Sequence, residues 1–226
     1  MSIISNRDKE AIAKEFASLD KPVKLVNFTQ EIECQYCRET SSLVKELGDL
    51  SDKVTTEVHN FTLDTEATEK YKIDKIPAIA FVDGEDYGLR FYGIPSGYEF
   101  MTLLETIKMI STGESGLSLK TKRFLKELRT PVHLQVFVTP TCPHCTRAVS
   151  LAYKFAYESP LITADAIEII EFPHLAQKYE VQGVPKTVIS ESVHLVGAVP
   201  EETLLDSIRE AIADLHTHSV EKENSI

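Results

Sequence analysis

Four cysteines give this sequence its most evident chemistry. They form two C-x-x-C pairs, Cys34 with Cys37 and Cys142 with Cys145. Pairs with this spacing bind zinc, form structural disulfides or carry out redox chemistry. The spacing alone does not choose among these, so the residues around each pair must decide.

The surroundings of the two pairs repeat. The stretch "PVKLVNFTQEIECQYC" matches "PVHLQVFVTPTCPHC" later in the chain. In both copies a proline, Pro77 or Pro185, follows the first cysteine by 43 positions (77 − 34 and 185 − 142). A repeat of about a hundred residues indicates a duplicated domain. We therefore predict two units, 1–115 and 116–226, divided in the Gly/Ser-rich stretch "STGESGL".

Composition limits the possible partners and location. The chain has 226 residues, of which 42% are hydrophobic and 26% charged, and its net charge is −11. This charge argues against nucleic acid or an anionic membrane as the main partner. We see no signal peptide and no apolar run long enough to cross a bilayer. The expected location is cytoplasmic, where paired cysteines are more often catalytic or metal-binding than structural.

Each copy is expected to contain the same series of helices and strands. An amphipathic helix leads, and a strand ending near the C-x-x-C follows, with a helix leaving from the cysteines. A second strand, a short helix, a β-hairpin after the proline and a last helix complete the copy. The predicted segments include leading helices at 6–19 and 119–129, second strands at 53–61 and 166–172, last helices near 99–110 and 202–215, and a frayed end at 216–226.

A C-x-x-C at the first strand-to-helix junction, with an X-Pro before the third strand, is the thioredoxin pattern. The fold class is therefore α/β, with two tandem thioredoxin-like units. Each unit is expected to be a mixed sheet flanked by helices, with an extra N-terminal helix.

The stretch "FYGIPSGYEF", the paired C-x-x-C units and the leading helix extend this likeness to nearly the whole chain. Together they resemble the protein disulfide oxidoreductases of thermophilic archaea and bacteria, which are two fused thioredoxin-like or glutaredoxin-like units related to protein disulfide isomerase. The resemblance implies an enzyme that forms, reduces or isomerises protein disulfides. It implies protein substrates with thiols or disulfides, a thioredoxin reductase-like electron donor and no cofactor.

The position of each pair suggests different roles for its two cysteines. The thiolate is the attacking form in disulfide exchange. Cys34 and Cys142 are expected at the start of a helix, where free N–H groups and the macrodipole favour an anion. Cys37 and Cys145 are expected one turn further in, more buried, and able to release the partner from a mixed disulfide.

The enclosed dipeptides are expected to tune the two sites differently. Gln35 and Tyr36 offer polarity but no cation, whereas Pro143 is followed by the imidazole of His144. That imidazole can stabilise the neighbouring thiolate, which makes the corresponding disulfide more oxidising. We therefore predict that the second site is the stronger oxidant.

The resemblance also assigns a role to the repeated prolines. In thioredoxin-like proteins this proline is cis and lies beside the disulfide. The backbone of the preceding residue, Ile76 before Pro77 or Val184 before Pro185, would then pair with an extended substrate of any sequence.

One departure from thioredoxin concerns the proton acceptor. Thioredoxins keep a buried aspartate beneath the second cysteine, but the matching stretches here are Asn27-Phe28 and Gln135-Val136, which contain no carboxylate. Glu168 and Glu171, expected on a neighbouring strand, are candidate acceptors for the second site.

Other functions are less favoured by the sequence. A zinc ion shared by both pairs would join cysteines 105 positions apart (142 − 37), whereas zinc ribbons place theirs within about 20 residues. An iron–sulfur scaffold would leave the helix and the proline without a role. A redox-linked holdase and the reductase-docking domain of a peroxidase system stay open, as does the net direction of exchange.

Overall fold

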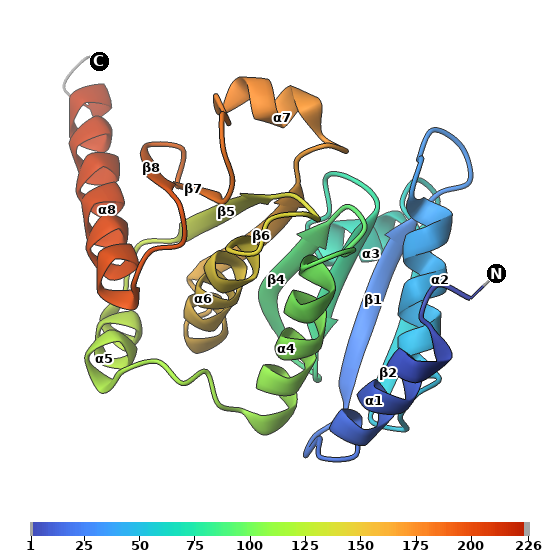
Figure 1. Ribbon diagram of the computed structural model, residues 1–226. Helices are drawn as coiled ribbons and strands as arrows, with labels where there is room; N and C mark the ends of the chain where they lie inside the picture. Colours follow the sequence, from blue (N-terminus) through green and yellow to red (C-terminus); the bar gives the residue numbers. More distant parts are fainter. Residues whose placement is uncertain (1, 224–226) are drawn as a thin grey trace.

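The computed structural model describes residues 2–223, which build an α/β fold around one eight-stranded sheet (Figure 1). The strands are β1 (Val23–Thr29), β2 (Val54–Asn60), β3 (Ala78–Val82), β4 (Asp86–Tyr92), β5 (Val132–Val138), β6 (Ile162–Glu168), β7 (Lys186–Ile189) and β8 (Val193–Val196). The helices are α1 (Asn6–Phe16), α2 (Cys37–Gly48), α3 (Thr65–Lys70), α4 (Glu99–Thr112), α5 (Leu119–Glu127), α6 (Cys145–Glu158), α7 (Pro173–Lys178) and α8 (Glu201–Glu223).

Both copies of the sequence repeat have the same strand arrangement. The first half of the sheet has the order β2-β1-β3-β4, and the second half has the order β6-β5-β7-β8. In each half the first strand is parallel to one neighbour and antiparallel to the other. The predicted tandem thioredoxin-like fold, with a mixed sheet and a leading helix in each copy, is confirmed.

The two halves join edge to edge. Strand β4 of the first copy pairs in parallel with β6 of the second, with Tyr92 opposite Ile167. Helices α4 and α6 pack side by side in front of these strands (Figure 1). The Tyr153 hydroxyl on α6 donates a hydrogen bond of 2.6 Å to the Arg90 carbonyl on β4. Because β4 and β6 are parallel, the segments that follow them leave from the same edge of the sheet.

The apolar core lies on both faces of the sheet because successive strand residues point to opposite sides. On β3, Ile79 and Phe81 belong to the larger cluster, together with apolar residues of α1, α2, α4, α5 and α6. Ala78 and Ala80 belong to a smaller cluster that includes Tyr71, directly after α3, and Tyr179, directly after α7. Both clusters contain residues of both copies, so the copies share the core on each face of the sheet.

Local sequence signals explain several helix ends. The Ser5 and Ser118 hydroxyls accept N–H bonds at the starts of α1 and α5, as serine N-caps do. Helix α4 ends where Gly113 adopts a left-handed conformation with φ 75°, which glycine reaches without strain. The unit boundary predicted at 115/116 falls between α4 and α5 and stays a prediction.

Two sequence-based predictions of elements were wrong. The strand predicted at 166–172 is β6, which starts at Ile162 and ends at Glu168. It ends there because the Glu168 carboxylate accepts the N–H groups of Ile170 and Glu171, which closes a turn. The end predicted to fray from residue 216 is helical as far as Glu223.

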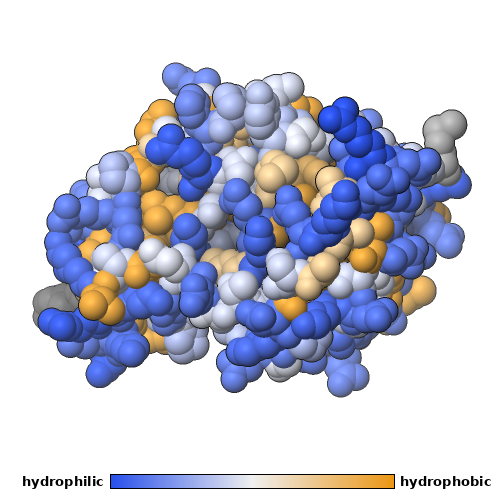
Figure 2. All heavy atoms as spheres, turned by 60° about the horizontal axis from the view of Figure 1, so that its bottom comes forward, coloured by the Kyte–Doolittle hydropathy of each residue, from blue (hydrophilic) through white to orange (hydrophobic). Residues whose placement is uncertain are grey.

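The surface is mainly polar on the face seen from the bottom of Figure 1. Figure 2 shows hydrophilic side chains over most of this face, with apolar groups scattered between them. Within residues 2–223, none of the helices combines the length and the apolar composition that crossing a bilayer requires.

Candidate active sites

Each C-x-x-C pair forms a disulfide directly before a helix. The Cα atoms are 5.5 Å apart in both Cys34–Cys37 and Cys142–Cys145, a usual separation for a disulfide. Helix α2 begins at Cys37 and α6 at Cys145. The expectation that the first cysteine starts the helix is therefore wrong by three residues. The intervening residues form a bend in the first copy and a turn in the second, where the Cys145 N–H donates to the Cys142 carbonyl over 3.3 Å.

The two sulfurs of each pair differ in exposure. The second cysteines, Cys37 and Cys145, are 1% and 0% exposed, whereas Cys142 is 9% exposed and Cys34 is half-buried. The expected burial order is confirmed. The four sulfurs form two separate disulfides, and the described part of the chain places no three His, Cys, Asp or Glu side chains as a metal-binding group.

The repeated prolines both follow cis peptide bonds, as expected, and in the second copy the residue before the proline lies beside the disulfide. The Ile76–Pro77 and Val184–Pro185 peptide bonds are both cis. The Cys142 sulfur lies 3.7 Å from the Val184 carbonyl oxygen. Each proline carbonyl also accepts a 2.8 Å hydrogen bond from a glycine that follows the hairpin, Gly93 in the first copy and Gly197 in the second.

The residues between the cysteines lie near the surface. Gln35, Pro143 and His144 are exposed, and Tyr36 is half-buried. His144 directly precedes α6, and its side chain makes no hydrogen bond to the end of that helix. His144 therefore lies in the turn that the second disulfide encloses, while the effect of its imidazole on the redox equilibrium stays a prediction.

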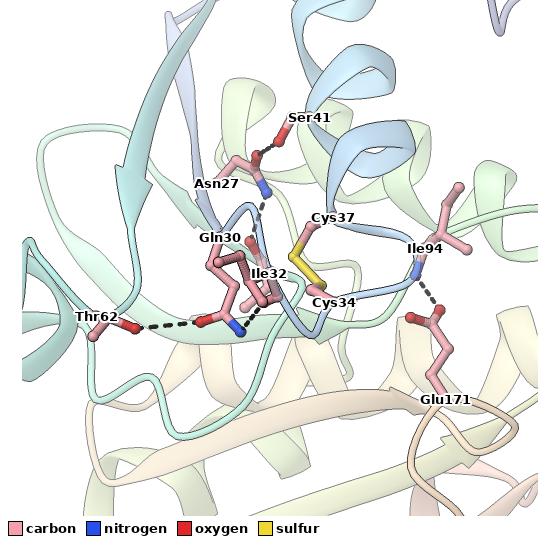
Figure 3. The surroundings of a disulfide bond; sticks show 10 residues. Asn27, Gln30, Ile32, Cys34, Cys37, Ser41, Thr62, Ile94 and Glu171 are labelled. Atoms are coloured by element: carbon pink, nitrogen blue, oxygen red, sulfur yellow. Dashed lines mark hydrogen bonds between the residues drawn. A yellow bond between two sulfur atoms is a disulfide. The ribbon is translucent and has the colours of Figure 1, made fainter.

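At the position where thioredoxins have a buried acid, the first copy has Asn27 and the second has the apolar Val136, while the amide of Gln135 lies on the opposite face of the sheet. Asn27 is fully buried; it donates to the Ala78 carbonyl over 3.1 Å and accepts from the Ser41 hydroxyl at 2.6 Å (Figure 3). Gln135 donates to the Tyr179 hydroxyl and to Glu191, both at 3.1 Å. These amides tie the strands to neighbouring elements and cannot take up a proton at neutral pH.

Known proteins resemble the chain both in part and along most of its length. The thioredoxin domain family matches residues 132–210. A thioredoxin from Methanocaldococcus jannaschii is 32% identical over 82 residues, which are 36% of this chain and 96% of that protein. A protein disulfide oxidoreductase from Aeropyrum pernix K1 has 33% sequence identity and a TM-score of 0.87, over 92% of this chain and 93% of that one. This chain belongs to the protein disulfide oxidoreductases.

The oxidoreductase is thus a thiol–disulfide exchange enzyme with two C-x-x-C sites. Its fold also matches the N-terminal domain of the alkyl hydroperoxide reductase AhpF from Enterococcus faecalis, with a TM-score of 0.83 and 23% identity over 91% of this chain and 99% of that one. The chain spans about a third of the length of the curated AhpF proteins that it matches.

The two acidic candidates of the oxidoreductase lie at the junction of its copies. Glu168 is 2% exposed, and its carboxylate binds its own turn. The Glu171 carboxylate instead accepts the N–H of Ile94, in the first copy, at 2.7 Å. Figure 3 shows this contact in the surroundings of the Cys34–Cys37 disulfide. Glu171 was expected to serve the second site, and the structure places it beside the first.

Sequence reasoning missed another acid near the junction, the buried Glu99. This residue starts α4 and has no solvent exposure, and desolvation raises its pKa to about 7. One carboxyl oxygen accepts a 2.9 Å bond from Thr102, and the other has no hydrogen-bond partner within residues 2–223. The backbone of the preceding Tyr98 contacts Pro140 and Thr146, on either side of the second disulfide. The only signal in the sequence was an acid within the otherwise apolar and small "FYGIPSGYEF".

Proposed function

We propose that the oxidoreductase acts directly on protein disulfides, with Cys34 and Cys142 as nucleophiles and Cys37 and Cys145 as resolving cysteines. The observation that carries this proposal is the approach of the Cys142 sulfur to the Val184 carbonyl, 3.7 Å away. A chain that pairs with the backbone at Val184 would bring its own sulfur close to Cys142. Ile76 has the same position before Pro77 in the first copy.

In the reductive direction, the thiolate of the first cysteine attacks a substrate sulfur, and the other substrate sulfur leaves as a thiolate. The second cysteine then loses its proton and attacks the mixed disulfide. This step forms the intramolecular disulfide and releases the second substrate thiol, so two electrons pass from the enzyme to the substrate. Oxidation of a dithiol substrate is the reverse sequence.

Loss of a proton from a buried cysteine requires an acceptor. Glu99 fits this role at the second site because it is buried, because one of its oxygens is unpartnered among the described residues and because its pKa is about 7. A carboxyl group with a pKa near neutrality exchanges protons readily at physiological pH. Its position next to Tyr98, which contacts the segments on both sides of the Cys142–Cys145 disulfide, supports this assignment.

An electron donor of the thioredoxin reductase class is the proposed partner. The likeness to AhpF, an alkyl hydroperoxide reductase, supports reductase-linked electron transfer. It also supports the second candidate function, in which the chain relays electrons between a reductase and a peroxidase without acting on diverse proteins. A cytoplasmic location and two units at 1–115 and 116–226 are further parts of this proposal.

Insulin reduction with dithiothreitol as the electron source separates the two functions. Direct action on protein disulfides predicts a turnover well above the uncatalysed rate, which falls strongly in Cys142→Ser. Cys34→Ser is the matched control, since it removes the corresponding sulfur of the other copy. A wild-type rate no higher than that of dithiothreitol alone would favour the relay function.

A further inference from the structure

The junction of the two copies brings an acid of one copy to the active site of the other. Glu171 follows β6 and Ile94 follows β4, and these strands are neighbours in parallel pairing. The Glu171 carboxylate therefore reaches across the junction and accepts the Ile94 N–H at 2.7 Å (Figure 3).

The residue that Glu171 binds is adjacent to the glycine that bonds to the proline of the first site. Ile94 follows Gly93, whose N–H donates to the Pro77 carbonyl over 2.8 Å. Gly93 has a φ of 97°, and a Cβ there would lie 2.8 Å from the Glu171 carboxylate oxygen and 2.7 Å from the Glu168 Cβ. The carboxylate can bind Ile94 only because residue 93 has no side chain.

The second copy has the same proline contact without the acid. Gly197 also donates to its proline carbonyl over 2.8 Å and has a φ of 85°. Within the described chain, no atom lies within 4 Å of the position where its Cβ would be. Strand β8 ends the sheet, so no further copy lies beside this segment.

We propose that Glu171 is a positioning residue for the first active site. Its carboxylate holds the 93–94 segment against Pro77, and so the second copy fixes the groove in which Cys34 meets a substrate. The proposal rests on the proposed action of Cys34 as a nucleophile.

The charge on Glu171 should make its positioning of the 93–94 segment depend on pH. Desolvation raises its pKa to about 7; the Ile94 N–H opposes this rise, and the charge of Glu168 adds to it. The facing segment 93–98 carries no charged side chain. Among the residues labelled around this contact in Figure 3, the other titratable groups are the thiols of Cys34 and Cys37 when that site is reduced. Above pH 7 the acceptor is a carboxylate, which binds an N–H more strongly than a neutral carboxyl does.

The Glu171→Gln variant tests this pH dependence, because glutamine resembles the protonated acid and can still accept the hydrogen bond from the Ile94 N–H. The background is Cys142→Ser/Cys145→Ser, in which the first site alone reacts, and the measurement is the rate at which the reduced site cleaves a peptide disulfide. The ratio of parent to Glu171→Gln rates should be near one below pH 6 and about fivefold above pH 8, with a midpoint near 7. Using the ratio cancels the part of the thiol ionisation that both proteins share.

The matched control is Glu171→Gln in the Cys34→Ser/Cys37→Ser background, where the ratio should stay near one at every pH. A ratio that is flat with pH at the first site, or that changes equally at both sites, would overturn the proposal. A first site that is inactive even with Glu171 present would instead refute the assignment of Cys34.

A second variant tests the same contact by changing the first copy, at Gly93, instead of Glu171. Gly93→Ala places a methyl group against the carboxylate, whereas Gly197→Ala has a similar φ and no described neighbour to displace. Gly93→Ala should slow its own site more than Gly197→Ala slows the second site. Equal slowing would show that backbone strain, and not the acid, accounts for the effect.

Discussion

Replacing Glu99 with glutamine should stabilise the protein at alkaline pH. Glu99 has no solvent exposure, and burial raises its pKa from 4.5 to about 7. Above that pH the folded state must hold a buried carboxylate with one oxygen unpartnered among the described residues. Glutamine has nearly the same shape and carries no charge at any pH.

The expected size of this stabilisation follows from the difference between the folded and unfolded pKa values of Glu99. The folded and unfolded pKa values differ by about 2.5 units (7 − 4.5), and each unit corresponds to about 1.4 kcal/mol, so the effect is on the order of 3 kcal/mol. Between pH 4.5 and 7 the folded state binds more protons than the unfolded state, so stability falls as pH rises. The contribution of protonated Glu99 to stability, fully present below pH 4.5, is therefore lost as the pH rises through 7.

Guanidinium unfolding of the oxidised wild type and Glu99→Gln, from pH 4 to pH 8.5, measures this effect. The two free energies of unfolding should agree near pH 4 within the cost of the substitution. The variant should then gain up to about 3 kcal/mol relative to wild type by pH 8. Glu171, whose pKa is also raised to about 7, is present in both proteins and cancels in the difference.

A difference that does not vary with pH would refute the reasoning, because it would mean that Glu99 titrates normally in the folded protein. A variant that loses stability above pH 7 would show that the carboxylate makes a favourable interaction in the fold. If Glu99 accepts the proton of Cys145, the more stable variant should also reduce peptide disulfides more slowly at its second site.

Three further predictions concern the division of labour and the junction. Serine at Cys142 and Cys145 should remove most oxidation of a reduced model peptide, whereas serine at Cys34 and Cys37 should spare oxidation and impair disulfide reshuffling; the opposite pattern would reverse the assignment. His144→Tyr should make the second site more reducing in a glutathione equilibrium without changing the melting temperature, and an unchanged equilibrium would discount the imidazole. Tyr153→Phe, which removes the hydroxyl bonded to the Arg90 carbonyl, should lower the free energy of unfolding by about 1 kcal/mol; an unaltered denaturation midpoint would show that this bond does not stabilise the junction.

Most of each copy could be predicted because its signals are local. Apolar periodicity and the positions of the cysteines and prolines predicted the element order, and the repeat could have corrected the one misplaced strand. Adding the offset of 108 between cysteines (142 − 34) to Val54, the start of β2, gives Ile162, where β6 begins. The sequence prediction followed the apolar run at 166–172 instead, and its last residues lie in a turn.

The junction could not be predicted from those signals. Each half of the sheet has two edges, and nothing in the composition of β4 or β6 states which edges pair. The roles of Glu99 and Glu171 depend on that pairing, since each acid is next to the other copy's site only after the halves join. Glu99 therefore looked like an ordinary first-turn acid, and Glu171 was assigned to the nearer cysteines in its own copy.

The pairing of β4 with β6 explains how two related sites acquired different surroundings. Asn27 in the first copy and Val136 in the second leave each copy without an acid beneath its own cysteines. Glu171 of the second copy contacts the proline segment of the first site, and Glu99 of the first copy lies beside the segments that hold the second disulfide. These contacts differ because β4 has a neighbouring copy and β8 has none. Producing the two copies as separate proteins, divided between α4 and α5, would therefore remove these acids from the sites that they contact, and would expose two strand edges that now pair.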